Sequence, residues 1–149
     1  MSSLVLSFAL VLLLVIAAID MRAKVVPDAL TIPFILLAFV AAFVMRGVVP
    51  VAGPTVAAAF FGVQWILSRG RWIGSCDVLL AFGIGALLAR PAAVLLWLLF
   101  TYMSGAVVAF ALLAMGKANR NTQLAFSPFM VIALIFLLVF GDTILEKFY

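Results

Sequence analysis

The chain has 149 residues, of which 69% are hydrophobic and only 9% charged, and its mean hydropathy is +1.43. A water-soluble domain of this size is about half apolar and roughly a quarter charged, so the composition excludes a soluble globule. The net charge is +4, but the lysines and arginines stand singly or in pairs, which excludes a tract that binds nucleic acid. The sequence therefore predicts one all-α integral membrane domain over residues 1–149.

Six apolar segments separated by charged residues are each interpreted as a transmembrane helix, because a span needs about 20 mostly apolar residues. In chain order they cover residues 2–19, 29–45, 51–68, 72–89, 92–115 and 126–144. The first is interpreted as a retained helix, since no Lys or Arg precedes it as in a signal peptide. The fourth reaches sufficient length only if it begins near Trp72, which places Asp77 about one and a half turns inside it. Small residues at Ala81, Gly85 and Ala89 recur at helix-packing intervals and are interpreted as packing positions.

The distribution of basic residues predicts the orientation of these helices. The loops after the first, third and fifth helices carry two basic residues each, and the segments on the other side carry one each. The first group is Arg22, Lys24, Arg69, Arg71, Lys117 and Arg120, and the second is Arg46, Arg90 and Lys147. Because Lys and Arg are enriched in cytoplasmic loops, the first group is expected in the cytoplasm and both termini outside it.

The reactive side chains of the chain are few, which limits the chemistry it can perform. The chain has no histidine and a single cysteine, Cys76, which excludes catalysis by Ser-His-Asp or Cys-His groups, histidine-ligated zinc and internal disulfides. The acidic residues are Asp20, Asp28, Asp77, Asp142 and Glu146. Any catalysis is therefore expected to depend on carboxyl groups, with no metal and no cofactor.

Asp77 is the strongest candidate for a functional residue, because an ionisable side chain inside a membrane span marks a functional site by default. Asp20 ends the first helix, which runs inward, whereas the fourth helix runs outward. Both aspartates are therefore expected at the cytoplasmic end, at similar depth. Two carboxyl groups close together in a poorly solvated place share a proton, so one can act as a base and the other as an acid, as in aspartic proteases.

Structural alternatives exist for each of these acids. Asp20 could pair with Arg22 or Lys24 at the membrane surface, and Asp77 could pair with Arg71 or cap its helix. Asp28 follows a proline and precedes an apolar run, so it is interpreted as the N-cap of the second helix.

Three stretches resemble the motifs of the type IV prepilin peptidase and preflagellin peptidase family. The first, residues 18–31, has an aspartate at a helix end, a basic residue two positions on and a Pro-Asp turn. The second, residues 74–80, is similar to a Gly-x-Gly-Asp motif, and the third, residues 126–129, is similar to Pro-Phe-x-Pro-Phe. The matching positions are Asp20, Arg22, Pro27 and Asp28, then Gly74, Cys76 and Asp77, then Pro128.

This resemblance implies a six-helix aspartyl endopeptidase of the cell inner (cytoplasmic) membrane, with Asp20 and Asp77 as the catalytic pair. Its implied partners are prepilin, pseudopilin or preflagellin precursors, whose leader peptide it would remove at the cytoplasmic face. The chain has a single cysteine and no paired Cys-x-x-Cys insert. It therefore resembles the short, peptidase-only form of the family, and N-methylation is not expected.

The chain departs from the family pattern at three positions. Cys76 stands in place of a glycine, Leu79 in place of a lysine and Ala125 in place of a proline. These departures leave open a catalytically impaired assembly factor with the peptidase fold. A second alternative is a small proton- or cation-coupled transporter component with Asp77 as its ion site, although the chain lacks a transporter-type repeat. The oligomeric state is left open.

Overall fold

The protein is all-helical within residues 2–24, 26–117 and 125–145, which the computed structural model describes. Three charged residues that entered the sequence analysis, Arg120, Glu146 and Lys147, lie outside these ranges. The helices are α1 (Ser2–Ala23), α2 (Asp28–Arg46), α3 (Ala52–Ser68), α4 (Ser75–Leu88), α5 (Pro91–Ala114) and α6 (Ser127–Leu145). The expected helical fold class is therefore confirmed for this part of the chain.

The helices differ in whether they can cross a membrane by themselves. Three segments have the length and apolar composition of a span, and they are Leu4–Ala23, Asp28–Arg46 and Pro91–Ala114. Helices α3 and α4 and the segment Ser127–Gly141 of α6 are apolar but shorter. With 14 residues, α4 is about 21 Å long, whereas a typical hydrocarbon core is about 30 Å thick.

The predicted start of the fourth helix, near Trp72, is wrong. Helix α3 ends in a turn where Arg69 and Gly70 adopt left-handed backbone conformations, with φ of 52° and 73°. The chain is extended at Gly74 before α4 begins at Ser75. Asp77 therefore lies in the first turn of α4 rather than one and a half turns inside it.

Two further boundaries differ from the prediction near the acidic residues. Helix α1 continues to Ala23, so Asp20 lies in its last turn rather than at its end. Asp28 is the first residue of α2, and Pro27 occupies the N-cap position with no side-chain capping bond. The Pro27 carbonyl accepts the backbone N–H groups of Leu30 and Thr31. This start suits the fixed φ of proline, so the N-cap interpretation of Asp28 is wrong.

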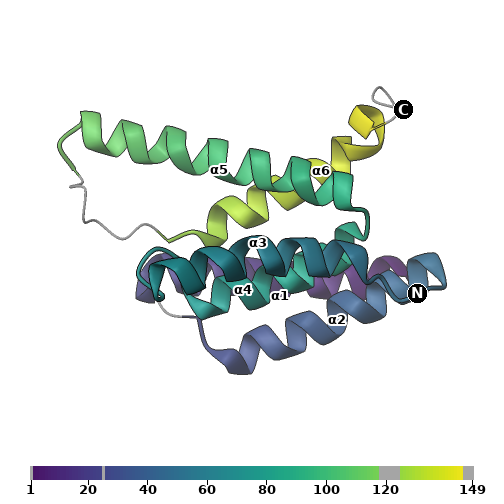
Figure 1. Cartoon of the computed structure of the whole chain (residues 1–149). Coiled ribbons are helices and arrows are strands. Elements are labelled where there is room, and N and C mark those ends of the chain that lie inside the picture. The colour runs from purple at the N-terminus through teal and green to yellow at the C-terminus, as the bar shows by residue number, and fades with distance from the viewer. Residues whose placement is uncertain (1, 25, 118–124, 146–149) are drawn as a thin grey trace.

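Helix α4 lies at the centre of the bundle, where it packs against α2 and α3. Most of its residues are buried, including all of residues 83–88. Helices α5 and α6 pack on each other, and α6 also packs on α1. In Figure 1, α5 leans away from the bundle towards its C-terminal end, whereas α6 starts beside the bundle and crosses α5.

The backbones of α3 and α4 touch where two glycines meet. A Cβ atom on Gly85 would lie 2.7 Å from the carbonyl oxygen of Gly53 and 2.8 Å from Cα of Pro54. The N–H of Gly53 donates to the carbonyl of Ala89 (3.1 Å). The interpretation of Gly85 as a packing position is therefore confirmed.

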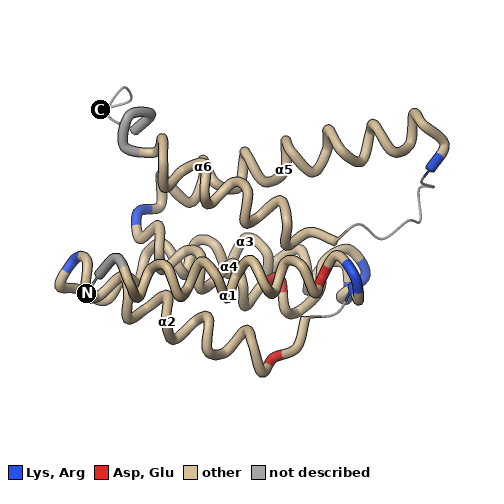
Figure 2. The backbone as a smooth tube through the Cα atoms, turned by 180° about the vertical axis from the view of Figure 1, so that it is seen from behind, with Lys and Arg blue, Asp and Glu red and all other residues tan. Residues whose placement is uncertain are grey.

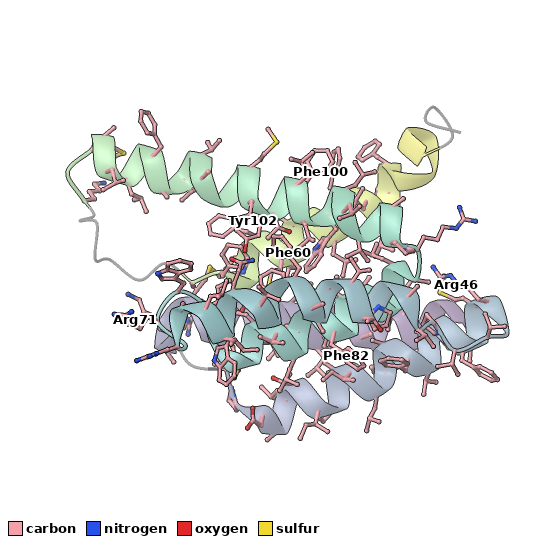
Figure 3. The ribbon with its side chains drawn as sticks, viewed as in Figure 1. Arg46, Phe60, Arg71, Phe82, Phe100 and Tyr102 are labelled. Carbon is pink, nitrogen blue, oxygen red and sulfur yellow. The ribbon has the colours of Figure 1, made fainter. Side chains whose placement is uncertain are left out.

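Charged residues gather at the two ends of the helices, and Figure 2 shows the acidic residues that it colours, which are Asp20, Asp28 and Asp77, towards one end. Arg69 and Arg71 lie in the turn between α3 and α4, near that end. Arg46 ends α2 at the opposite end and donates from Nη2 to the carbonyl of Leu87 (2.9 Å). Figure 3 shows Arg46 and Arg71 at opposite ends of the molecule.

Candidate active site

Asp20 is fixed by the first residue of another helix. Its side chain is only 8% exposed, and its Oδ2 accepts the backbone N–H of Ser127 at the start of α6 (3.2 Å). The first N–H groups of a helix have no partner within the helix, so a carboxylate satisfies one of them well. Among the described side chains Asp20 makes no ion pair with Arg22 or Lys24, which are both exposed.

The third motif holds the start of α6 in the place where it meets Asp20. The ring of Phe126 packs against those of Phe61 and Tyr102, with centroid distances of 5.8 and 5.2 Å. Phe129 is buried one turn further on. Pro128 is the second residue of the helix, where its missing N–H costs no hydrogen bond. The aromatic anchors and the proline thus position the N–H group that Asp20 accepts.

Asp77 caps the start of its own helix. Its Oδ2 accepts the N–H of Gly74 (3.2 Å), and its own N–H donates to the carbonyl of Gly74 (3.2 Å). Gly74 has no side chain, so this is one half of a capping box. The capping alternative therefore describes a real contact, which occupies one of the two carboxyl oxygens. Arg71 bonds instead to the carbonyl of Ser68 (3.3 Å).

Asp20 and Asp77 lie on helices whose backbones do not approach closely within the described residues. Helices α1 and α4 each pack against α2 and α6. Even so, the carboxyl groups of Asp20 and Asp77 are close enough for their charges to interact. The structure therefore brings the predicted pair to one end of the bundle from two helices that share neighbours.

Cys76 ties the start of α4 to the turn between α1 and α2. Its Sγ donates to the carbonyl of Val26 (3.3 Å) and lies 3.8 Å from Oδ1 of Asp28. Cys76 is not among the residues with positive φ, so this position does not need the conformational freedom of a glycine. Leu79, the second departure in this motif, is partly exposed on α4.

Not every motif residue takes part in this arrangement. Arg22 is exposed in the last turn of α1 and makes no hydrogen bond or ion pair within the described part of the chain. Pro27 and Gly74 occupy the N-cap positions of α2 and α4. Over the same described residues, no three Cys, Asp or Glu side chains come together as metal ligands would.

The structure adds polar residues near the pair that the sequence analysis missed. The Tyr102 hydroxyl donates to Oε1 of Gln64 (2.9 Å), and the Tyr102 phenol lies within electrostatic range of Asp77. Figure 3 shows Tyr102 facing Phe60 between α5 and α3. Gln64, a polar residue within an apolar helix, is the signal in the sequence that could have indicated this contact. Ser127 gave no such signal, because it acts on Asp20 through its backbone.

Fold and site together define a helical membrane protein with a pair of carboxyl groups at one end. The sequence matches the type IV leader peptidase family over residues 7–110. This match covers more than half of the chain and includes Asp20 and Asp77, so the chain belongs to the type IV leader peptidase family. The third motif lies beyond the matched residues. No curated protein and no solved structure matches the chain.

Proposed function

We propose that this protein is an aspartic endopeptidase that removes the leader peptide of a prepilin-like, pseudopilin-like or preflagellin-like precursor. Membership of the leader peptidase family supports peptide hydrolysis. The observation that carries the proposal is the placement of Asp20 and Asp77. They lie on different helices at the same end of the bundle, and a backbone N–H at a helix start binds each of them.

The two carboxyl groups suffice for the acid and base steps of this reaction. One carboxylate takes a proton from a water molecule as the water attacks the carbonyl carbon of the scissile peptide bond. The other, protonated carboxyl donates to the oxygen on which negative charge develops. When the C–N bond breaks, a proton passes to the leaving nitrogen, so a carboxylic acid and an amine are released.

The positions of the aspartates in their helices support cleavage at the membrane surface. Asp20 lies three residues before the end of α1, and Asp77 lies two residues after the start of α4. At a rise of about 1.5 Å per residue, both are within one turn of their helix ends. An active site this close to the helix ends would be within reach of water at the membrane surface, and the substrate's apolar helix could remain in the bilayer. The basic residues at this end favour its placement in the cytoplasm.

The test is co-expression with a precursor that carries its leader, with cleavage scored by a mobility shift and by mass spectrometry. We expect wild type to remove the leader, and Asp20→Asn and Asp77→Asn each to lower the rate at least about 100-fold. Asp142→Asn is the matched control, because Asp142 lies near the opposite end of α6. It should cleave at the wild-type rate.

Two results would contradict the proposal in different ways. Cleavage that survives both active-site substitutions would exclude the aspartic mechanism. A wild-type protein that accumulates in the membrane but cleaves no precursor would favour the non-catalytic assembly factor instead.

A further inference from the structure

Among the described residues, the hydroxyl group of Ser127 is buried without a hydrogen-bond partner. Ser127 is 1% exposed, and its Oγ has no partner in the part of the chain that the structure describes. Buried side-chain hydroxyls are nearly always bonded, and an unbonded one lowers stability. Ser127 is the first residue of α6 and lies one position after the N-cap, where the side chain of a serine would accept a backbone N–H.

This hydroxyl belongs to the residue that binds Asp20. The backbone N–H of Ser127 donates to Oδ2 of Asp20 (3.2 Å), so the side chain branches from the Cα atom next to that nitrogen. Phe126 and Phe129 hold the residue on either side through their ring contacts. The position of the hydroxyl is therefore fixed close to one member of the acid pair, whose charge in turn interacts with Asp77.

We infer that Ser127 is a third polar group of the active site, an inference that rests on the proposed function. Its hydroxyl oxygen accepts a hydrogen bond from the attacking water, while the carboxylate acting as base accepts the other proton of that water. A hydroxyl can accept two hydrogen bonds and donate one. Ser127 exchanges no proton and forms no covalent bond. It orients the water, and its hydroxyl, which has no partner among the described residues, gains one when the reacting groups are bound.

The substitution Ser127→Ala separates this role from a structural one. It removes the hydroxyl and keeps the N–H that binds Asp20. We expect kcat to fall about 10-fold to 100-fold, because a misplaced reactant costs a factor of this order, with KM changed less than twofold. The thermal unfolding midpoint of the purified protein should stay the same or rise, since an unpaired buried polar group is removed.

Ser68→Ala is the matched control. Ser68 is equally buried, but its hydroxyl donates to the carbonyl of Trp65 and accepts the N–H of Trp72 (both 3.3 Å). This variant should lower the unfolding midpoint and leave kcat unchanged. Ser127→Ala should therefore lower kcat without lowering the unfolding midpoint, and Ser68→Ala should lower the unfolding midpoint without lowering kcat.

The outcomes distinguish this inference from the proposed function. If wild type cleaves, Asp20→Asn does not and Ser127→Ala turns over as fast as wild type, the inference is wrong and the proposed function stands. A drop in the unfolding midpoint of Ser127→Ala would show a structural role for the hydroxyl and overturn the inference. Wild type without cleavage would overturn both.

Discussion

Among the described residues, Asp20 and Asp77 are both oriented by the main chain rather than by basic side chains. Each binds a backbone N–H with Oδ2, Asp20 at the start of α6 and Asp77 at the N-cap of α4. An asparagine in either place keeps a carbonyl oxygen that can accept the same N–H. The Asp→Asn variants should therefore preserve the fold and remove only the ability of the group to act as a base or an acid, which makes their loss of activity interpretable.

The substitution Cys76→Gly tests whether the departure from the family motif impairs the protein. It removes the bond from Sγ to the Val26 carbonyl and places a flexible residue in the first turn of α4. We expect the protein to lose about 1 kcal/mol of stability, seen as a lower thermal unfolding midpoint. The cleavage rate per folded molecule should change less than about threefold, because Cys76 is in an unstrained conformation.

The opposite result would be equally informative. A rise in cleavage of tenfold or more for Cys76→Gly, with an unchanged unfolding midpoint, would show that the thiol hinders the site. Cys76→Ser is the control, since its hydroxyl can still donate to the Val26 carbonyl. It should unfold close to the wild-type midpoint and cleave at the wild-type rate.

The sequence was informative about side-chain chemistry and much less so about contacts made by the backbone. Asp77 stood out because a charge in an apolar segment is costly, and the alternation of helix direction placed it at the same end as Asp20. The contribution of Ser127 to Asp20 comes through an N–H group that every residue except proline has. No residue pattern could single out that group before the start of α6 was located.

Helix α4 shows how far length alone can mislead at the level of an element. The requirement for a full span moved its predicted start to Trp72, whereas the helix begins at Ser75. A helix of 14 residues is stabilised here because neighbouring helices bury most of its second half. The element is therefore defined by packing against α2 and α3, which the apolar pattern of α4 alone could not specify.

The crossing of α3 and α4 gives a prediction at this scale. Gly85→Ala would place a methyl group against the carbonyl oxygen of Gly53 and the Cα atom of Pro54. Both are backbone atoms, so they cannot move aside as the end of a flexible side chain can. Overpacking of this kind costs about 1–3 kcal/mol, so the thermal unfolding midpoint should fall clearly. Cleavage should fall in parallel with the folded fraction.

Gly62→Ala is the matched control in the neighbouring helix. A Cβ atom there meets only Cγ1 of Val78, at 3.9 Å. Alanine is favoured over glycine inside a helix by up to about 1 kcal/mol, so this variant should keep or raise the midpoint. Equal effects of the two substitutions would mean that α3 and α4 do not cross at Gly53 and Gly85.

At the scale of the molecule, hydropathy sufficed to predict the order of the helices that the structure describes, because apolar segments between charges can be identified one by one. The way α5 leans from the bundle (Figure 1) depends on contacts between distant segments, which hydropathy does not report. The distribution of charge was partly informative. Basic residues predicted which turns share a side, and the acidic residues coloured in Figure 2 lie towards one end.

The orientation in the membrane is the last prediction, and the single cysteine makes it testable. In a Cys76→Ser background, a new cysteine would replace either Val49, between α2 and α3, or Trp72, between α3 and α4. These side chains are 58% and 74% exposed, so both thiols should be accessible.

A membrane-impermeant maleimide should label Val49→Cys in intact cells and Trp72→Cys only after the membrane is opened. Labelling in the reverse pattern would put the aspartates outside the cytoplasm. The precursor's leader would then never reach them, so the proposed site of cleavage would be wrong even if the aspartic chemistry were right.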